Sequence, residues 1–155
     1  MKYRMLTGEE LEVLAEDLKH FLIVNGVHDE EWREMNLSDV PKATSLVELF
    51  SDTVLQKVYE KIRYIEHRTE TSCMVFSLNK DKIELISLNA KHNSDVDLST
   101  PESIHSALIN DSDSLTIFKS EKNYSKEREL EIHEMLEQGC VNSTKEFWDA
   151  LHKTV

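Results

Sequence analysis

The chain has 155 residues, 39% of them hydrophobic and 31% charged, and its 30 Asp and Glu against 18 Lys and Arg give a formal net charge of -12. This length fits one domain of ordinary size, and the negative charge argues against a general nucleic-acid binder, which must neutralise phosphates with basic side chains. The three glycines, Gly8, Gly26 and Gly139, lie too far apart for a Walker-type phosphate loop or a G-x-G-x-x-G nucleotide motif.

The first part of the chain predicts three helices. Thr7 and Glu10 form a capping box, apolar residues at helical spacing follow through residues 11–22, and Gly26 provides a stop. A short second helix begins with Asp29 as N-cap. Residues 36–41 indicate a break, and a longer helix is expected from about residue 45 to about residue 61.

The periodicity then changes from helical to alternating. Residues 61–68, 72–78 and 82–88 predict an antiparallel meander of three strands. The second and third of these strands are apolar on both faces, which indicates a sheet covered on both sides, or at least a central strand with no solvated face.

The last third of the chain returns to helices around one more strand. Thr100 and Pro101 open a short helix, residues 115–119 predict a fourth strand, and Ser125 is expected to cap a highly charged helix that Gly139 ends. A second capping box, in residues 143–146, begins a terminal helix.

These elements predict one α+β domain over residues 1–155. The expected order is α-α-α-β-β-β-α-β-α-α, with a three- to four-stranded, mainly antiparallel sheet and the N- and C-terminal helices packed against it. The longest apolar run, residues 21–24, is far too short to cross a bilayer, and no secretory signal is recognised, so a cytoplasmic protein with reduced cysteines is expected.

One candidate for chemistry is the strand segment with Glu66 and His67. An acid beside an imidazole could bind a metal or transfer a proton. Strand alternation, however, sends the two side chains to opposite faces. This favours a strand end with solvated charges, where Arg68 protects the edge against pairing with another strand.

A second candidate comes from the order of the elements, which is also that of the core of restriction-endonuclease-like nucleases. Asp81 and Glu84 could hold Mg²⁺ there, with His67 or His92 nearby. The lysine that should follow the third-strand acid is replaced by Ile86, which weakens this interpretation. Glu102 with His105, and His133 with Glu129 and Glu137, are only weak metal-binding patterns, and no HxH, HExxH or Cys/His cluster is present, so no metal or cofactor is expected.

Three aromatic residues are candidates for an interface. Trp32 and Trp148 could anchor a partner if partly exposed, and Tyr124 lies in the only locally basic stretch, residues 119–128. The alternative for each tryptophan is an ordinary core position. For the basic stretch, the alternative is a simple connection from strand to helix.

Three segments carry a family resemblance: residues 1–7, residues 57–67, and residues 124–128 with 136–139. The chain resembles a functionally uncharacterised family of short acidic proteins found mainly in Bacteroidetes. The resemblance implies a bacterial cytoplasmic protein whose single domain occupies the full length, and it carries no activity, cofactor or catalytic residue.

The function is unknown from sequence, and three hypotheses remain open. The first is a small non-enzymatic cytoplasmic binding protein, with a protein partner or self-association; the charge disfavours nucleic acid, and no membrane association is expected. The second is a metal-dependent hydrolase or degenerate nuclease-like enzyme that uses the sheet carboxylates. The third is an acidic inhibitor or nucleic-acid mimic.

Overall fold

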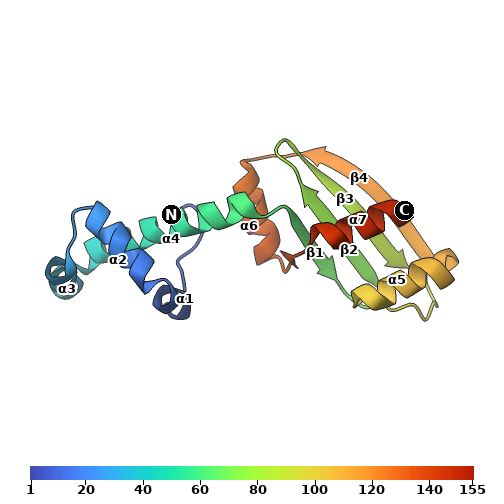
Figure 1. Ribbon diagram of the computed structural model, residues 1–155, viewed down its shortest axis with the longest axis horizontal. Helices are drawn as coiled ribbons and strands as arrows, with labels where there is room; N and C mark the ends of the chain where they lie inside the picture. Colours follow the sequence, from blue (N-terminus) through green and yellow to red (C-terminus); the bar gives the residue numbers. More distant parts are fainter. The chain divides into compact units, whose positions relative to one another are not determined.

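The computed structural model describes residues 1–155, which form two compact units, residues 1–60 and 61–155 (Figure 1). The first unit is helical, and the second combines helices with an antiparallel sheet, which confirms the α+β class. The single-domain organisation stays a prediction.

The helices of the first unit are α1 (Gly8–Val13), α2 (Ala15–Val24), α3 (Asp29–Ser38) and α4 (Val40–Lys61). The predicted capping box at Thr7 and Glu10 is present. The prediction of a single first helix was wrong, because Leu14, with φ -99° and ψ 19°, separates α1 from α2. Glu16 and Asp17 then lie in the first turn of α2, where the helix dipole favours acids.

The predicted break over residues 36–41 reduces to the single residue Asp39, so α4 begins earlier than expected. Pro41 lies in the first turn of α4, where a helix makes no use of the missing N–H. The expected start near residue 45 was therefore too late.

Residues 1–6 lie along α4 and are bonded to it. The backbone amides of Lys2 and Tyr3 donate to the Asp52 carboxylate at 2.7 and 2.9 Å, and that of Leu6 donates to Ser51 Oγ at 3.1 Å. These bonds satisfy polar groups of an extended segment that has no strand partner. The apolar core of the unit is formed by Leu6, Leu22, Val27, Ala43, Phe50, Leu55 and Tyr59.

The second unit contains five antiparallel strands in the order β4-β3-β2-β1-β5. Their bounds are β1 (Tyr64–Arg68), β2 (Ser72–Leu78), β3 (Lys82–Ala90), β4 (Leu115–Asn123) and β5 (Val141–Asn142). The expected three to four strands were too few, because a two-residue strand carries no alternation that a sequence could reveal. The fourth strand is nine residues long instead of the expected five, since its second half is polar.

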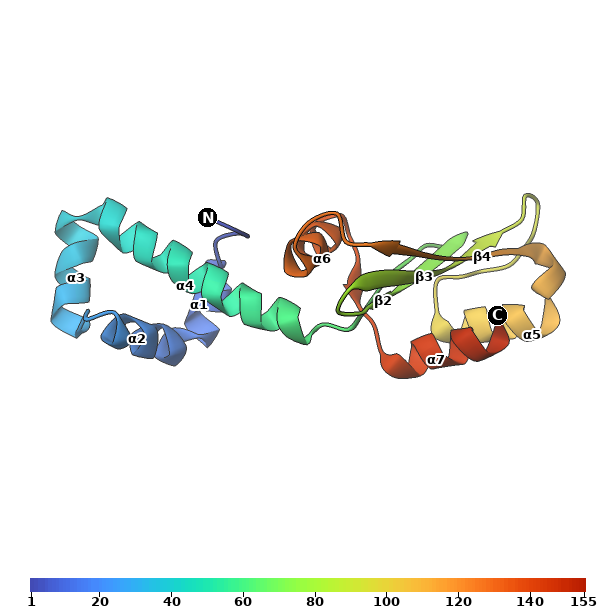
Figure 2. The same ribbon diagram turned by 90° about the horizontal axis from the view of Figure 1, so that it is seen from above.

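Helices α5 (Pro101–Asn110) and α7 (Lys145–Thr154) cover one face of the sheet, whereas α6 (Arg128–Glu137) lies on the other side, at one end (Figure 2). The core between the sheet and the first two helices is formed by Cys73, Val75, Ile86, Leu88, Leu98, Ile104, Ala107, Leu115, Trp148 and Leu151. The expected cover on both faces is thus partial: α5 and α7 leave β4 exposed on their face, and α6 covers only one end of the other.

The helix starts of this unit agree with the sequence in one case and differ in two. Thr100 with Pro101 opens α5 as predicted. The terminal helix is present as α7, but residues 143–146 form no capping box: the N-cap is Thr144, which accepts from Phe147 N. Ser125 does not cap α6, whose N-cap is Glu127. None of the seven helices is long and apolar enough to cross a membrane.

Candidate functional site

Glu66 and His67 point to opposite faces of β1, as alternation predicts. Glu66 lies on the face covered by α7, is 6% exposed, and places Oε2 2.6 Å from Arg68 Nε. His67 lies on the other face beside Gly139, where an added Cβ would sit 3.7 Å from the imidazole ring. The two side chains therefore form no catalytic pair.

The other candidate residues of the enzyme hypothesis are also separated. Asp81 is exposed in the connection between β2 and β3, and His92 is exposed after β3. Glu84 is half-buried on β3, where Asn79 Nδ2 donates to it at 3.3 Å. No group of three or more His, Cys, Asp and Glu residues is arranged to hold a metal ion.

Neither cysteine is placed as a nucleophile. Burial raises the pKa of the Cys73 thiol to about 12, helped by the negative charge of Glu66 on the neighbouring strand. Burial also raises the pKa of Cys140. Both cysteines are free and are held as thiols at neutral pH, the less reactive form.

The aromatic interface candidates are engaged within their own units. Trp148 is 7% exposed and packs against the Tyr64 and His152 rings at centroid distances of 6.2 and 6.1 Å. Trp32 is half-buried and lines a cavity of about 250 Å³ in the helical unit, together with Leu11, Ala15, Leu18, Lys19, Leu22, Val27, His28 and Asp29.

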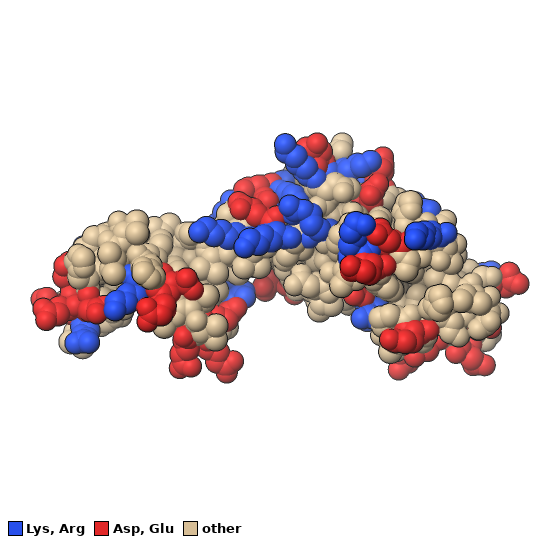
Figure 3. Space-filling view, viewed as in Figure 1, with Lys and Arg blue, Asp and Glu red and all other residues tan.

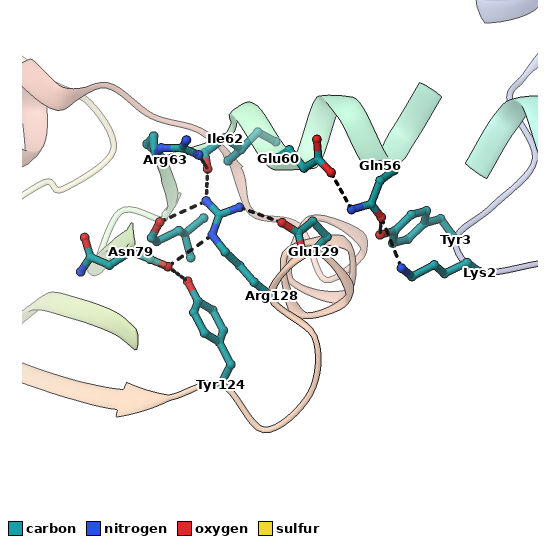
Figure 4. A network of polar contacts seen from close by, with 11 residues as sticks. Lys2, Tyr3, Gln56, Glu60, Ile62, Arg63, Asn79, Tyr124, Arg128 and Glu129 are labelled. Carbon is teal, nitrogen blue, oxygen red and sulfur yellow. Dashed lines mark hydrogen bonds and ion pairs between the residues drawn. The ribbon is translucent and has the colours of Figure 1, made fainter. Parts of the chain in front are cut away.

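Tyr124 belongs to a polar network around Arg128, which sequence reasoning missed (Figure 4). The Tyr124 hydroxyl donates to the Asn79 carbonyl at 2.6 Å. The Arg128 guanidinium donates to the same carbonyl at 3.3 Å, to the Leu78 carbonyl at 3.1 Å and to the Ile62 carbonyl. Arg128 thus connects the start of α6 to the residues just before β1 and at the end of β2. Its role is therefore structural.

Other basic side chains of residues 119–128 are paired with acids of α6. Lys126 Nζ lies 2.6 Å from Glu134, and Lys122 Nζ lies 3.6 Å from the buried Glu131, which also accepts from the Ser125 amide at 3.1 Å. This stretch therefore offers little free positive charge to an anion. On the face of this unit that Figure 3 shows, Lys and Arg side chains are interspersed with Asp and Glu.

Lys119 is the exception in this stretch, because it is exposed and has no hydrogen-bond or ion-pair partner for its ammonium group. It lines a shallow cavity of about 260 Å³ on the face that carries α7, together with Glu84, Leu85, Ile86, Ser120, Glu121, Trp148 and His152. Glu121 lies opposite Glu84 in the register of β3 and β4, and Lys82 Nζ approaches their carboxylates at 2.8 and 3.8 Å respectively.

The most open part of the unit is the β4 edge. Every residue of β4 after Leu115 is exposed, and two of them are large and apolar: Ile117 at 41% and Phe118 at 56%. Phe118 continues an apolar strip on the face away from α5 and α7, where register places Met74, Phe76 and Leu85, all half-buried. The sequence signal for this surface was the apolar pair Ile117 and Phe118, which is followed by charged residues of both signs.

A comparison with protein-family models gives one match, described as "Family of unknown function (DUF6495)", over residues 1–155. No curated protein and no solved structure matches the chain. The resemblance to a family of unknown function is thereby confirmed for the whole chain.

Proposed function

The chain belongs to the DUF6495 family of unknown function, and for this member we propose a non-enzymatic role: it binds another polypeptide, which adds a strand at the β4 edge. The observation that carries the proposal is the exposure of β4 along eight of its nine residues. The unpaired N–H and C=O groups of an outer strand are a template for a further strand.

The apolar residues of β4 support a binding edge. Exposed aromatic side chains bury a large area at low entropic cost, and they recur as anchors of protein interfaces. Phe118 is 56% exposed beside this edge and continues the strip with Met74, Phe76 and Leu85. A strand added to β4 would place its own side chains against Phe118.

The charges of β4 argue against a nucleic-acid ligand. Lys122 is paired with Glu131, and Glu121 lies within the same strand, so the edge presents both signs. The scattered positions of Glu66, Asp81 and Glu84 give the enzyme hypothesis less support than the binding hypothesis. The proposed setting is the bacterial cytoplasm, in Bacteroidetes in particular, and it rests on the family resemblance.

The test is site-specific photocrosslinking. A benzoyl-phenylalanine replaces Phe118 on β4 or, as a matched control, Ile109 on α5, which is 63% exposed. We expect discrete protein adducts from position 118 and none from position 109. The same adducts from both positions, or none from position 118, would contradict the proposal.

A further inference from the structure

The two edges of the sheet differ greatly in length. β5 forms one edge with two residues, whereas β4 forms the other with nine. Soluble proteins protect long edges with charges, bulges or covering elements. The β4 edge has charges of both signs and no covering element within its unit, so it is suited to pairing with a strand of complementary charge.

We propose that the occupant of this edge is a second copy of the chain, paired antiparallel through β4 about a two-fold axis at Ser120. This inference rests on the proposed function and names its partner. The two sheets would join into one continuous sheet, with each copy contributing the same strand to an isologous interface.

The two-fold symmetry restricts the possible registers. An axis perpendicular to the sheet keeps each side chain on its own face, so every register has one residue opposite its own copy. With Ser120 on the axis, Lys119 lies opposite Glu121 of the second copy, and this pair occurs twice. On the other face, Phe118 lies opposite Lys122 of the second copy, whose aliphatic stem can pack on the ring.

Neighbouring registers lack this complementarity. An axis at Lys119 places two ammonium groups opposite each other, and an axis at Glu121 does the same with two carboxylates; like charges directly opposite are unfavourable. An axis at Phe118 pairs Lys119 with Ile117 and Glu121 with Leu115. Only the Ser120 register matches each Lys119 with an acid.

Two features of the single chain agree with this register. Lys119 is exposed and has no charged partner of its own, whereas Lys122 of β4 and Lys126, which precedes α6, are both paired with acids of α6. Glu121 lies opposite Glu84 within the sheet, and Lys82 is the one cation within ion-pair distance of them. Lys119 of the second copy would sit on the free side of Glu121 and offset this excess of negative charge.

The experiment is sedimentation velocity on the full chain with two charge-reversed variants, Lys119→Glu and Glu121→Lys. We expect a concentration-dependent dimer for the wild type and a loss of at least tenfold in dimer affinity for each variant alone. In an equimolar mixture of the two variants, position 119 of each chain again faces an opposite charge, so the heterodimer should form. The matched control is Lys80→Glu in the β2–β3 connection, which should dimerise like the wild type.

The mixture distinguishes the loss of the charge pair from misfolding, because two misfolded variants would not restore each other's dimerisation. A wild type that stays monomeric at millimolar concentration, variants that dimerise like the wild type, or a mixture that stays monomeric would each overturn it. The proposed function fails separately: a monomeric chain that still crosslinks from position 118 to a different protein retains the binding role and loses only the second copy as partner.

Discussion

At the scale of single residues, the most consequential side chain is Arg128. Its side chain is 11% exposed and donates to the carbonyls of Ile62, Leu78 and Asn79, of which the first and last also accept from Arg63 and Tyr124. A charged donor forms stronger hydrogen bonds with such carbonyls than a neutral one, and removing it takes one donor from all three. In sequence, Arg128 is one of several basic residues in a mixed stretch, and nothing local distinguishes it.

We predict that Arg128→Met lowers the free energy of unfolding by about 3 kcal/mol, because it removes a mostly buried charged donor that three carbonyls share. Urea denaturation followed by circular dichroism measures the change. The control is Lys126→Met, which breaks an exposed pair with Glu134 and should cost about 0.5 kcal/mol. Equal effects of the two substitutions would contradict the structural role of Arg128.

At the scale of the elements, local sequence predicted the helix starts at Thr7 and Thr100, but not that of α3, whose N-cap is His28 instead of the expected Asp29. It also predicted the bounds of β2, whereas it fell short for β4. Thr7, Thr100 and Thr144 accept from amides in the first turns of α1, α5 and α7. Such caps act over three residues and need no tertiary contact. The second half of β4 is polar and becomes a strand because it pairs with β3, with Lys82 opposite Asn123.

Gly26 and Gly8 of the helical unit differ in backbone conformation, because only Gly26 has a positive φ. Gly26 ends α2 with φ +80°, whereas Gly8 begins α1, and an added Cβ would meet no atom within 4 Å at either position. Gly26→Ala should therefore destabilise the protein by about 1 kcal/mol through backbone strain alone. Gly8→Ala should stabilise it by about 0.5 kcal/mol, since it restricts the unfolded chain without strain. Thermal unfolding of both variants tests the pair, and destabilisation by Gly8→Ala would contradict the argument.

At the scale of the whole molecule, the net charge of -12 and the division into two units are the main features. Asp and Glu side chains gather along α1–α3 in the helical unit (Figure 3). The apolar core under α5 and α7 is built only from residues of the second unit. That core accounts for the burial of Cys73, Ile86 and Trp148.

We therefore predict that residues 61–155 expressed alone fold cooperatively. The fragment should show dispersed amide resonances and slow hydrogen exchange in β2 and β3, which lie inside the sheet. The full chain recorded under the same conditions is the control. An unfolded fragment would instead support the single-domain organisation that the sequence predicts.

The sequence by itself determined the α+β class, the helix starts at Thr7 and Thr100, the helix exits at Gly26 and Gly139, and the opposite directions of Glu66 and His67. All of these depend on residues within a turn or on strand alternation, which are local. Only the tertiary structure decided the role of Arg128, the two-residue β5, and the exposed nine-residue edge of β4. Their physical cause is pairing and burial between segments far apart in the chain, which no local pattern contains.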